Sequence, residues 1–463
     1  MKTFEIDKRG RTPIYEYLYR CIRDEICEGR LKKGEKLPSK RNLASLYGIS
    51  IITVENTYAQ LLLEGYITSV QKKGYFVSDI APISPSVKKN INVKNNSDIF
   101  INKKSDLSSN QIMYDNFPYS TWSKIMRKTL LDEEGKFLLS TGNKGIFDLR
   151  ESIAEYLSES RGLICDPNNI IIGAGTEYLY TMLMQLFGRN GMIAIEDPGH
   201  IKVSRIFESN GVRVLHIPVD RDGFDVESLN TTNITAIHIS PSHQFPTGIV
   251  MPARRRHSII DFAKKNNCYI IEDDYDSEFR YHGKPIPAMA SLDTEHVIYM
   301  NTFSKTLAPS VRIAYMVLPE KLSGMYDEKL GFMTCPVSGM EQYTLNQFIA
   351  GGYFDRHINR MRNYYRKHRD DILNCLKGSE LGKHINIHEE NAGLHFLIEI
   401  RKSNFDMGRY VRRLAKENIV IKPVNDYSYV PMKKYEKSIV FNYSDISVKE
   451  LSDILKAMYE CLK

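Results

Sequence analysis

The first 79 residues carry an apolar pattern that predicts helices and then a hairpin. Ile14, Leu18, Ile22 and Ile26 recur every fourth position, between Thr12-Pro13 and Gly29, which is the spacing of an amphipathic helix. A short second helix is expected after Ser39 and a third from about 51 to 64. Two β runs, 66–68 and 75–77, then flank a basic turn. This order predicts a winged helix-turn-helix.

The rear of the chain has a different pattern, in which short apolar runs end in polar, acidic or glycine-rich clusters. These runs are 170–172, 192–195, 236–239, 268–271 and 297–300. Short buried strands that alternate with helices predict an α/β domain with a mostly parallel sheet. Ligand groups are then expected where the strands end.

Residues 80–110 separate the two patterns. Pro, Ser, Asn and Lys dominate this segment, and no helical or strand period persists in it. We therefore predict a flexible linker at 80–110, a DNA-binding domain at 1–79 and a large domain at 111–463.

The net charge of +7 is concentrated near the N-terminus. Residues 1–79 hold 14 basic and 10 acidic side chains, 80–110 hold five and two, and the remainder is balanced. A basic end on a neutral body favours an anionic partner such as nucleic acid, although a solvated tail would have the same charge.

Two composition features narrow the class of protein. No apolar run approaches the roughly 18 residues of a membrane span, and we expect a cytoplasmic protein. The seven cysteines show no CxxC spacing, so we expect reduced thiols and neither a disulfide framework nor a metal site.

The polar clusters of the rear domain match the needs of one cofactor, pyridoxal phosphate. Backbone N–H groups, hydroxyls and an arginine suit a phosphate, a carboxylate suits a pyridinium, a phenol suits the ring oxygen, and an amine suits the aldehyde. The candidates, in chain order, are Gly175, Thr176, Asp273, Tyr275, Thr302, Ser304, Lys305 and Arg312.

Residues 10–78 resemble the DNA-binding domain of the GntR superfamily, through PSKRNLA and the later TV…A…L…EGY run. The resemblance implies that double-stranded DNA faces Lys40, Arg41, Ser50, Thr53, Asn56, Lys72 and Lys73. Ser50 is at least as well explained as a helix cap. Arg41 is the best candidate to read a guanine. Ile51 stands where the family often has arginine.

The motifs HQFPTG, EDDYDSEFRY and NTFSKTLAPSVR extend the resemblance over essentially the whole chain. They resemble fold-type I aminotransferases, specifically the MocR subfamily of GntR-type regulators. The resemblance implies a smaller α+β C-terminal subdomain. It makes Lys305 the internal aldimine lysine, Asp273 the partner of the pyridine nitrogen and Tyr275 the partner of the ring hydroxyl. His200 replaces the aromatic residue that stacks on the ring, and the remaining candidates hold the phosphate.

Three departures from aminotransferases bear on the ligand. Phe245 precedes PTG where they have asparagine, and Val440 stands where they have the arginine that binds the substrate carboxylate. Lys202 replaces an arginine of the γ-aminobutyrate sensors. We therefore expect a regulator that senses pyridoxal phosphate itself, as the pyridoxine-synthesis regulators of this subfamily do. An amino-acid or amine sensor and a working aminotransferase with a DNA-binding appendage are the alternatives.

The resemblance also implies a homodimer, because fold-type I sites are built at a dimer interface. A linker of about 30 residues has ample reach for the winged helix of one chain to lie over the large domain of the other. A small-molecule effector would then change the dimer geometry and its affinity for DNA.

Overall fold

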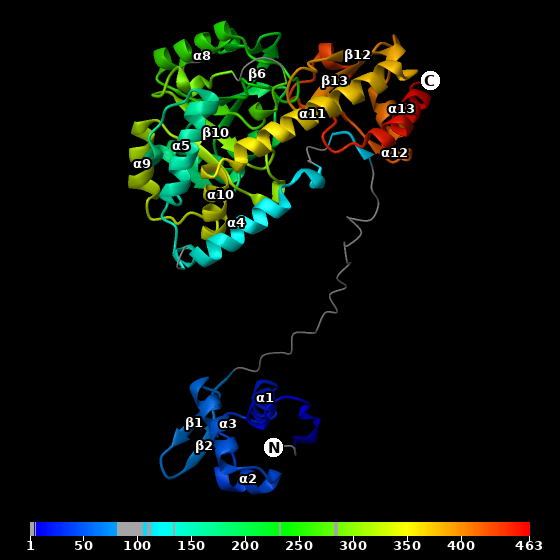
Figure 1. Ribbon diagram of the computed structural model, residues 1–463. Helices are drawn as coiled ribbons and strands as arrows, with labels where there is room; N and C mark the ends of the chain where they lie inside the picture. Colours follow the sequence, from blue (N-terminus) through cyan, green and yellow to red (C-terminus); the bar gives the residue numbers. More distant parts are fainter. Residues whose placement is uncertain are drawn as a thin grey trace. The chain divides into compact units, whose positions relative to one another are not determined.

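The computed structural model describes residues 4, 6–80, 105–108, 113–132, 135–230, 233–281 and 286–463. The chain divides into two compact units, Met1–Asn102 and Lys103–Lys463. Figure 1 shows the helices and strands of both units. Each unit has its own apolar core.

The smaller unit is a winged helix-turn-helix, as predicted. Its elements are α1 (Ile14–Cys27), α2 (Lys40–Tyr47), α3 (Ile51–Leu63), β1 (Ile67–Val70) and β2 (Gly74–Val77). The two strands pair antiparallel, with Ile67 opposite Val77. Leu18, Leu43 and Tyr58 from the three helices meet in the core.

The start of α1 differs by one position from the sequence prediction. We expected Thr12 to cap the helix and Pro13 to open it. Pro13 instead occupies the cap position with an extended backbone, φ −54° and ψ 143°, and the helix begins at Ile14. A proline ring fixes φ but not ψ, so it fits either position.

The larger unit is built on an eight-stranded sheet. Its strands are β4 (Ile170–Gly173), β5 (Met192–Asp197), β6 (Arg213–Asp220), β7 (Gly223–Phe224), β8 (Ala236–Ile239), β9 (Tyr269–Asp273), β10 (Val297–Thr302) and β11 (Ala314–Val317). Their order is β4-β11-β10-β9-β8-β5-β6-β7. Neighbours from β10 to β6 are parallel, whereas β11 is antiparallel to both β10 and β4. The mostly parallel sheet is confirmed.

Helices cover both faces of this sheet. They are α4 (Tyr119–Asp132), α5 (Phe147–Arg161), α6 (Thr176–Phe187), α7 (Ile201–Ser209), α8 (Ala253–Asn266), α9 (Glu320–Leu330) and α10 (Gly339–Ala350). Successive strand residues face opposite sides. Ile270 therefore packs with Leu149 of α5 and Leu345 of α10, whereas Ile271 packs with Leu179 of α6.

A C-terminal subdomain completes the larger unit. Its sheet has the order β12-β13-β16-β15, formed by Ile385–His388, His395–Ile400, Ser438–Asn442 and Lys422–Pro423. Helices α11 (Tyr353–Gly378), α12 (Met407–Lys416) and α13 (Val448–Leu462) pack with it around one core. In Figure 1 the long α11 runs from the large sheet to this subdomain. Across the described ranges, no helix has the length and apolar character needed to cross a bilayer.

The boundary of the larger unit lies earlier than predicted. We assigned 80–110 to the linker, but β3 (Ser105–Asp106) pairs in parallel with β14 (Ile419–Val420). Leu107 is fully buried in the core of the C-terminal subdomain. The described part of the larger unit therefore begins at Ser105, within the segment that we assigned to the linker. Residues 81–104 and 109–112 lie outside the described residues, and the linker prediction is not tested there.

Candidate functional site

The predicted cofactor residues follow the carboxyl ends of strands in the large sheet. Gly175 follows β4, Asp273 ends β9, and Lys305 comes three residues after β10. His200 lies between β5 and α7, where it occupies the helix cap. Parallel strands end at one edge of a sheet, so the fold gathers these residues as expected.

Asp273 is buried and has one carboxylate oxygen that lacks a partner. The Tyr180 hydroxyl donates to its Oδ2 at 2.7 Å, and His238 Nε2 lies 3.7 Å from that oxygen. Oδ1 has no hydrogen-bond partner among the described residues. Burial opposes ionisation, but contacts with His238 and Tyr180 lower the pKa of Asp273 below its ordinary value. A buried carboxylate with an open acceptor suits a protonated ring nitrogen.

Tyr180 and His238 are site residues that the sequence analysis missed. The phenol has one proton, which it gives to Asp273, so His238 Nε2 must donate to the phenol oxygen at 2.9 Å. Both side chains are buried. They come from α6 and β8, and no local sequence signal connects them with residue 273.

Lys305 lies in a partly buried loop, and its amine is less basic than that of an exposed lysine. Burial lowers the pKa of Lys305 to about 8, although the charge of Asp276 acts in the opposite direction. The adjacent Thr306 carbonyl is 2.7 Å from His357 Nε2 of α11. A larger neutral fraction makes this amine a better nucleophile at physiological pH.

The predicted phosphate residues form two groups, Gly175 with Arg312 and Thr302 with Ser304. Gly175 has φ 90°, and a Cβ at this position would lie 2.5 Å from Arg312 Nη2. The guanidinium also donates to the Ala174 carbonyl at 3.2 Å. Thr302 Oγ1 donates to Ser304 Oγ at 2.9 Å. The glycine is thus needed for both its backbone conformation and its close approach to the arginine.

Two charged residues beside this group have roles that the sequence did not reveal. Glu177, in the first turn of α6, forms an ion pair with Lys202 and lies 3.8 Å from Arg312 Nη2. The Lys202 side chain is 68% exposed. Lys202, which we considered as a substitute carboxylate ligand, therefore neutralises Glu177 on the surface.

His200 stacks on an aromatic side chain in the site. Its ring lies parallel to Phe245, with centroids 4.0 Å apart and planes 9° apart, and edge-on to Tyr275 at 5.8 Å. Burial lowers the pKa of His200 to about 4, and the charge of Lys305 adds to this effect while Asp273 opposes it. A neutral imidazole has a flat face suited to stacking on an aromatic ring.

An apolar wall surrounds Val440, the residue that we predicted to stand at the position of the aminotransferase arginine. Val440 of β16 is 1% exposed and packs with Leu397, Val424 and Phe245. The Phe245 ring also meets Tyr427 edge-on, with centroids 4.9 Å apart. A carboxylate placed against this wall would lose its hydration without gaining a charged partner.

His243 is a further buried polar residue that the sequence analysis quoted in HQFPTG without giving it a role. Its Nδ1 lies 2.8 Å from Asp276 Oδ2. The Tyr275 hydroxyl donates to the His243 carbonyl at 3.1 Å. The ring packs so closely on Gly393 that a Cβ there would overlap it. The packing on Gly393 holds His243 in place, and the hydrogen bond to the His243 carbonyl in turn orients Tyr275, the predicted partner of the ring hydroxyl.

Three of the predicted DNA-contacting residues, Lys40, Ser50 and Thr53, contact other residues of the smaller unit. Ser50 caps α3 by accepting from the Thr53 amide at 3.1 Å, and its hydroxyl is 2.8 Å from that of Thr53. Lys40 forms an ion pair with Glu55. Ser50 therefore caps the helix, as we considered. Whether it also contacts DNA stays a prediction.

Arg41, Asn56, Lys72 and Lys73 are exposed on the smaller unit. Lys72 adopts a left-handed backbone with φ 61° in the turn of the hairpin. Ile52 is also exposed on α3. This mixture of basic, amide and apolar side chains can meet phosphates, base edges and thymine methyl groups, and the contacts with DNA stay predictions.

Comparisons with known proteins agree with both units. Residues 102–457 match the family model for class I and II aminotransferases, and residues 14–77 match that for bacterial regulatory proteins of the gntR family. The chain is similar to the archaeal kynurenine aminotransferase of Pyrococcus horikoshii, with a TM-score of 0.69 and 22% identity over 78% of this chain and 91% of that one. At this identity the likeness shows the fold alone.

Three similar curated proteins are transcriptional or catabolism regulators by name. The HTH-type regulator YdeL of Bacillus subtilis is 38% identical over 96% of both chains. The probable rhizopine catabolism regulatory protein MocR of Rhizobium meliloti is 30% identical over 86% of this chain and 84% of its own. The HTH-type pyridoxine biosynthesis transcriptional regulator PdxR of Corynebacterium glutamicum is 29% identical over 84% and 83%. The chain therefore belongs to the MocR subfamily of GntR-type transcriptional regulators, in which a winged helix-turn-helix precedes an aminotransferase domain.

Proposed function

We propose that this regulator binds pyridoxal phosphate in its aminotransferase-like domain and that the cofactor itself is the effector. The bound form differs from the free form in its affinity for DNA, and the genes that it controls serve vitamin B6 synthesis. The name of the similar PdxR protein supports this gene class. A ligand shifts a conformational equilibrium only through its different affinities for the two states.

The residues present fit the cofactor. The open Oδ1 of Asp273 would accept from the ring nitrogen, Tyr275 would meet the ring hydroxyl, and His200 would stack on the ring. The turn at Gly175-Thr176 with Thr302, Ser304 and Arg312 would hold the phosphate. When bound, the cofactor supplies an aldehyde that reacts with a primary amine, and Lys305 is the amine for that reaction.

One observation carries the choice of effector, namely the apolar wall around Val440. An amino acid needs a charged partner for its carboxylate, and a buried carboxylate without one is costly. Val440 is buried among apolar side chains, and Lys202 already pairs with Glu177. The same features weigh against efficient transamination, so we propose that the aminotransferase chemistry of this domain is vestigial.

The test is a titration of the cofactor-free protein on a fluorescent DNA fragment from upstream of its own gene. Pyridoxal phosphate should change the affinity for this fragment, and amino acids or γ-aminobutyrate at sub-millimolar concentration should add little. Lys305→Ala should remove both the visible absorption band of the bound cofactor and the change in DNA affinity that the cofactor causes. If an amino acid shifts both the visible spectrum and the DNA affinity, the protein is an amine sensor. Steady turnover of an amino acid would make it an aminotransferase.

We further propose that the protein acts as a homodimer. Large apolar side chains of α4 and the following segment are exposed, among them Leu131 at 75% and Leu139 at 69%. A surface of this kind is typical of a subunit interface. The exchange of winged helices between the two chains stays a prediction. Sedimentation that gave a monomer at micromolar concentration with the cofactor bound would contradict the dimer.

A further inference from the structure

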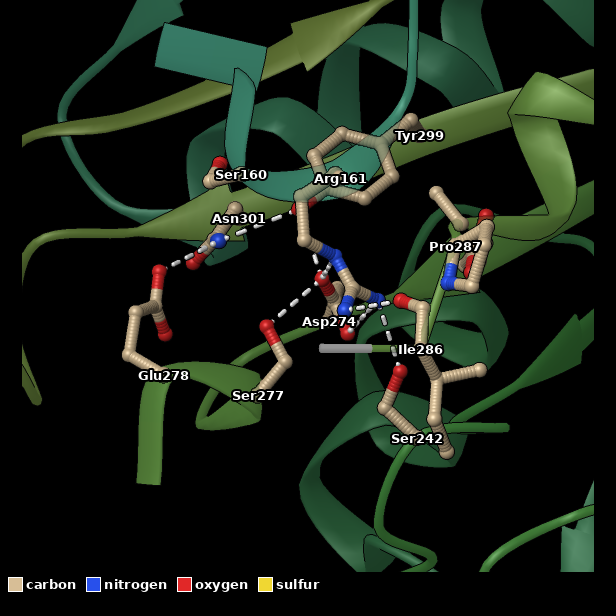
Figure 2. Close-up of polar contacts among 12 residues, drawn as sticks. Ser160, Arg161, Ser242, Asp274, Ser277, Glu278, Ile286, Pro287, Tyr299 and Asn301 are labelled. Carbon is tan, nitrogen blue, oxygen red and sulfur yellow. Dashed lines mark hydrogen bonds and ion pairs between the residues drawn. The ribbon is translucent and has the colours of Figure 1, made fainter. Parts of the chain in front are cut away.

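Asp274 lies in sequence between two predicted cofactor residues, Asp273 and Tyr275, but its carboxylate enters a separate buried network. The Tyr299 hydroxyl donates to its Oδ2 at 2.6 Å and the Ser277 hydroxyl at 2.8 Å. Arg161 donates to Oδ1 at 3.1 Å, and its Nε lies 2.9 Å from Oδ2. Figure 2 shows the arginine side chain at the centre of these contacts.

Arg161 joins three segments of the site region. It is the last residue of α5, and it also donates to the Ser242 hydroxyl at 2.8 Å and to the Ile286 carbonyl at 2.5 Å. Ser242 directly precedes His243, whose carbonyl accepts from Tyr275. One guanidinium therefore fixes the loop after β8, the segment after β9 and residue 286 relative to one another.

The network also reaches the segment that carries Lys305. Asn301 donates to the Tyr299 hydroxyl at 3.2 Å. The Asn301 side-chain oxygen in turn accepts from the Thr302 amide at 2.6 Å. The contacts from Arg161 through Asp274 and Tyr299 thus end at the start of the loop that holds the predicted phosphate and amine residues.

The Arg161–Asp274 pair is charged and completely enclosed. The two side chains are 5% and 0% exposed. Burial alone would lower the pKa of Arg161, but the charge of Asp274 raises it above its ordinary value. The neighbouring Glu278 is different, because burial raises its pKa to about 7. Removal of either member of the pair would leave an uncompensated charge beneath the site.

We infer that Arg161 and Asp274 are positioning residues for the cofactor site and act through Asp273 and Tyr275. Asp274 holds the backbone between these two residues, and its amide donates to the Met300 carbonyl at 2.9 Å. A shift of that backbone would misdirect the open oxygen of Asp273 and the phenol of Tyr275 together. This inference rests on the proposed binding of pyridoxal phosphate.

Arg150 provides a matched control on the same helix. It is also a buried arginine of α5, 9% exposed, and it donates to the Pro167 carbonyl at 2.7 Å. Pro167 precedes β4, at the strand end opposite Gly173. The two arginines are about 16 Å apart along the helix, at 1.5 Å per residue. Substitution of Arg150 should therefore destabilise the fold without disturbing Asp273.

The experiment compares Arg161→Gln, Arg161→Lys and Arg150→Gln in the full-length protein. It measures the Kd for pyridoxal phosphate, the visible circular dichroism of the bound cofactor, and the Tm without cofactor. Both glutamine variants should lower the Tm. Only Arg161→Gln should raise the Kd, at least tenfold, and change the dichroism, and Arg161→Lys should recover part of both. Equal cofactor binding in all folded variants, or equal losses in both glutamine variants, would overturn the inference.

A second pair of variants covers the case in which Arg161→Gln does not fold. Ser242→Ala and Tyr299→Phe each remove one hydroxyl from the network and keep the ion pair. Each should raise the Kd several-fold and alter the dichroism, and unchanged values in both would also overturn the inference. A wild-type protein that develops no visible band with pyridoxal phosphate would refute the proposed function, which is a distinguishable result.

Discussion

Replacement of Lys305 by methionine should abolish cofactor binding through the amine and stabilise the cofactor-free protein at neutral pH. The reason is the cost of a charged amine in a partly buried loop. Burial lowers the pKa of Lys305 from 10.5 to about 8 in the folded protein, with the charge of Asp276 as an opposing influence. The group has its ordinary pKa in the unfolded chain.

The sign and size of the effect follow from linkage. A base whose folded pKa is lowered costs stability when it is protonated in both states, which is the case below about pH 8. The cost decreases as the pH rises from 8 to 10.5 and is absent above that range. At 1.36 kcal/mol per pKa unit, the shift corresponds to about 3 kcal/mol. Because Lys305 is only partly buried, we expect Lys305→Met to stabilise the folded state by about 1–3 kcal/mol at pH 7.

Trp122 makes the measurement specific to the larger unit. It is the single tryptophan of the chain, and it lies in α4 at 9% exposure. Urea unfolding followed by its fluorescence should show the variant more stable than the wild type at pH 7, with a difference that narrows by pH 10. Lys202→Met, at an exposed lysine, should give no such gain. A Lys305→Met protein that is less stable at pH 7, or a gain that does not change with pH, would refute the reasoning.

Four other variants have distinct expected effects. Lys72→Ala with Lys73→Ala should weaken binding to specific and random DNA alike and reduce the log–log salt slope by about 2; an unchanged slope would exclude phosphate contact by the wing. Arg41→Ala should cost about 1–3 kcal/mol on the specific fragment and less on random DNA; equal losses would make it a phosphate contact only. Asp273→Asn should weaken cofactor binding about 10- to 100-fold, as expected for a lost charge-assisted hydrogen bond, and an unaltered Kd in a spectroscopic titration would mean that the open oxygen is not the acceptor. Gly175→Ala should raise the cofactor Kd about tenfold, because the Cβ of the new alanine would displace Arg312; tight binding by this variant would show that the arginine can move without loss.

The sequence predicted much of the fold because a buried strand or an amphipathic helix has a recognisable pattern within a short segment. The apolar runs at 170–172 and 297–300 are buried on both faces of the sheet, and such strands read as continuous apolar segments. β11 was not predicted, although Ala314–Val317 is also fully buried. It is antiparallel to both β4 and β10. Its pairing with β4 joins residues more than 140 positions apart, which no local window contains.

The candidate site divides in the same way. Lys305 and Asp273 were identified because polar residues that follow a strand have a recognisable order. A second set of residues, Tyr180, His238 and Arg161, comes from α6, β8 and α5 and lies in contact with Asp273 or its neighbour Asp274. Each is an ordinary side chain within its own helix or strand, so only the folded chain distinguishes it from its neighbours.

The place of β4 at one edge of the sheet has a consequence for the order of synthesis. Among the described strands, its single neighbour in the sheet is β11, with Ile170 opposite Val317. β4 therefore cannot join the sheet until the ribosome has passed residue 317. The winged helix, with a core of its own, is complete roughly 240 residues earlier, which is about 10–50 s at 5–20 residues per second. A nascent or prematurely ended chain would therefore carry a folded DNA-binding unit before any effector domain exists to regulate it.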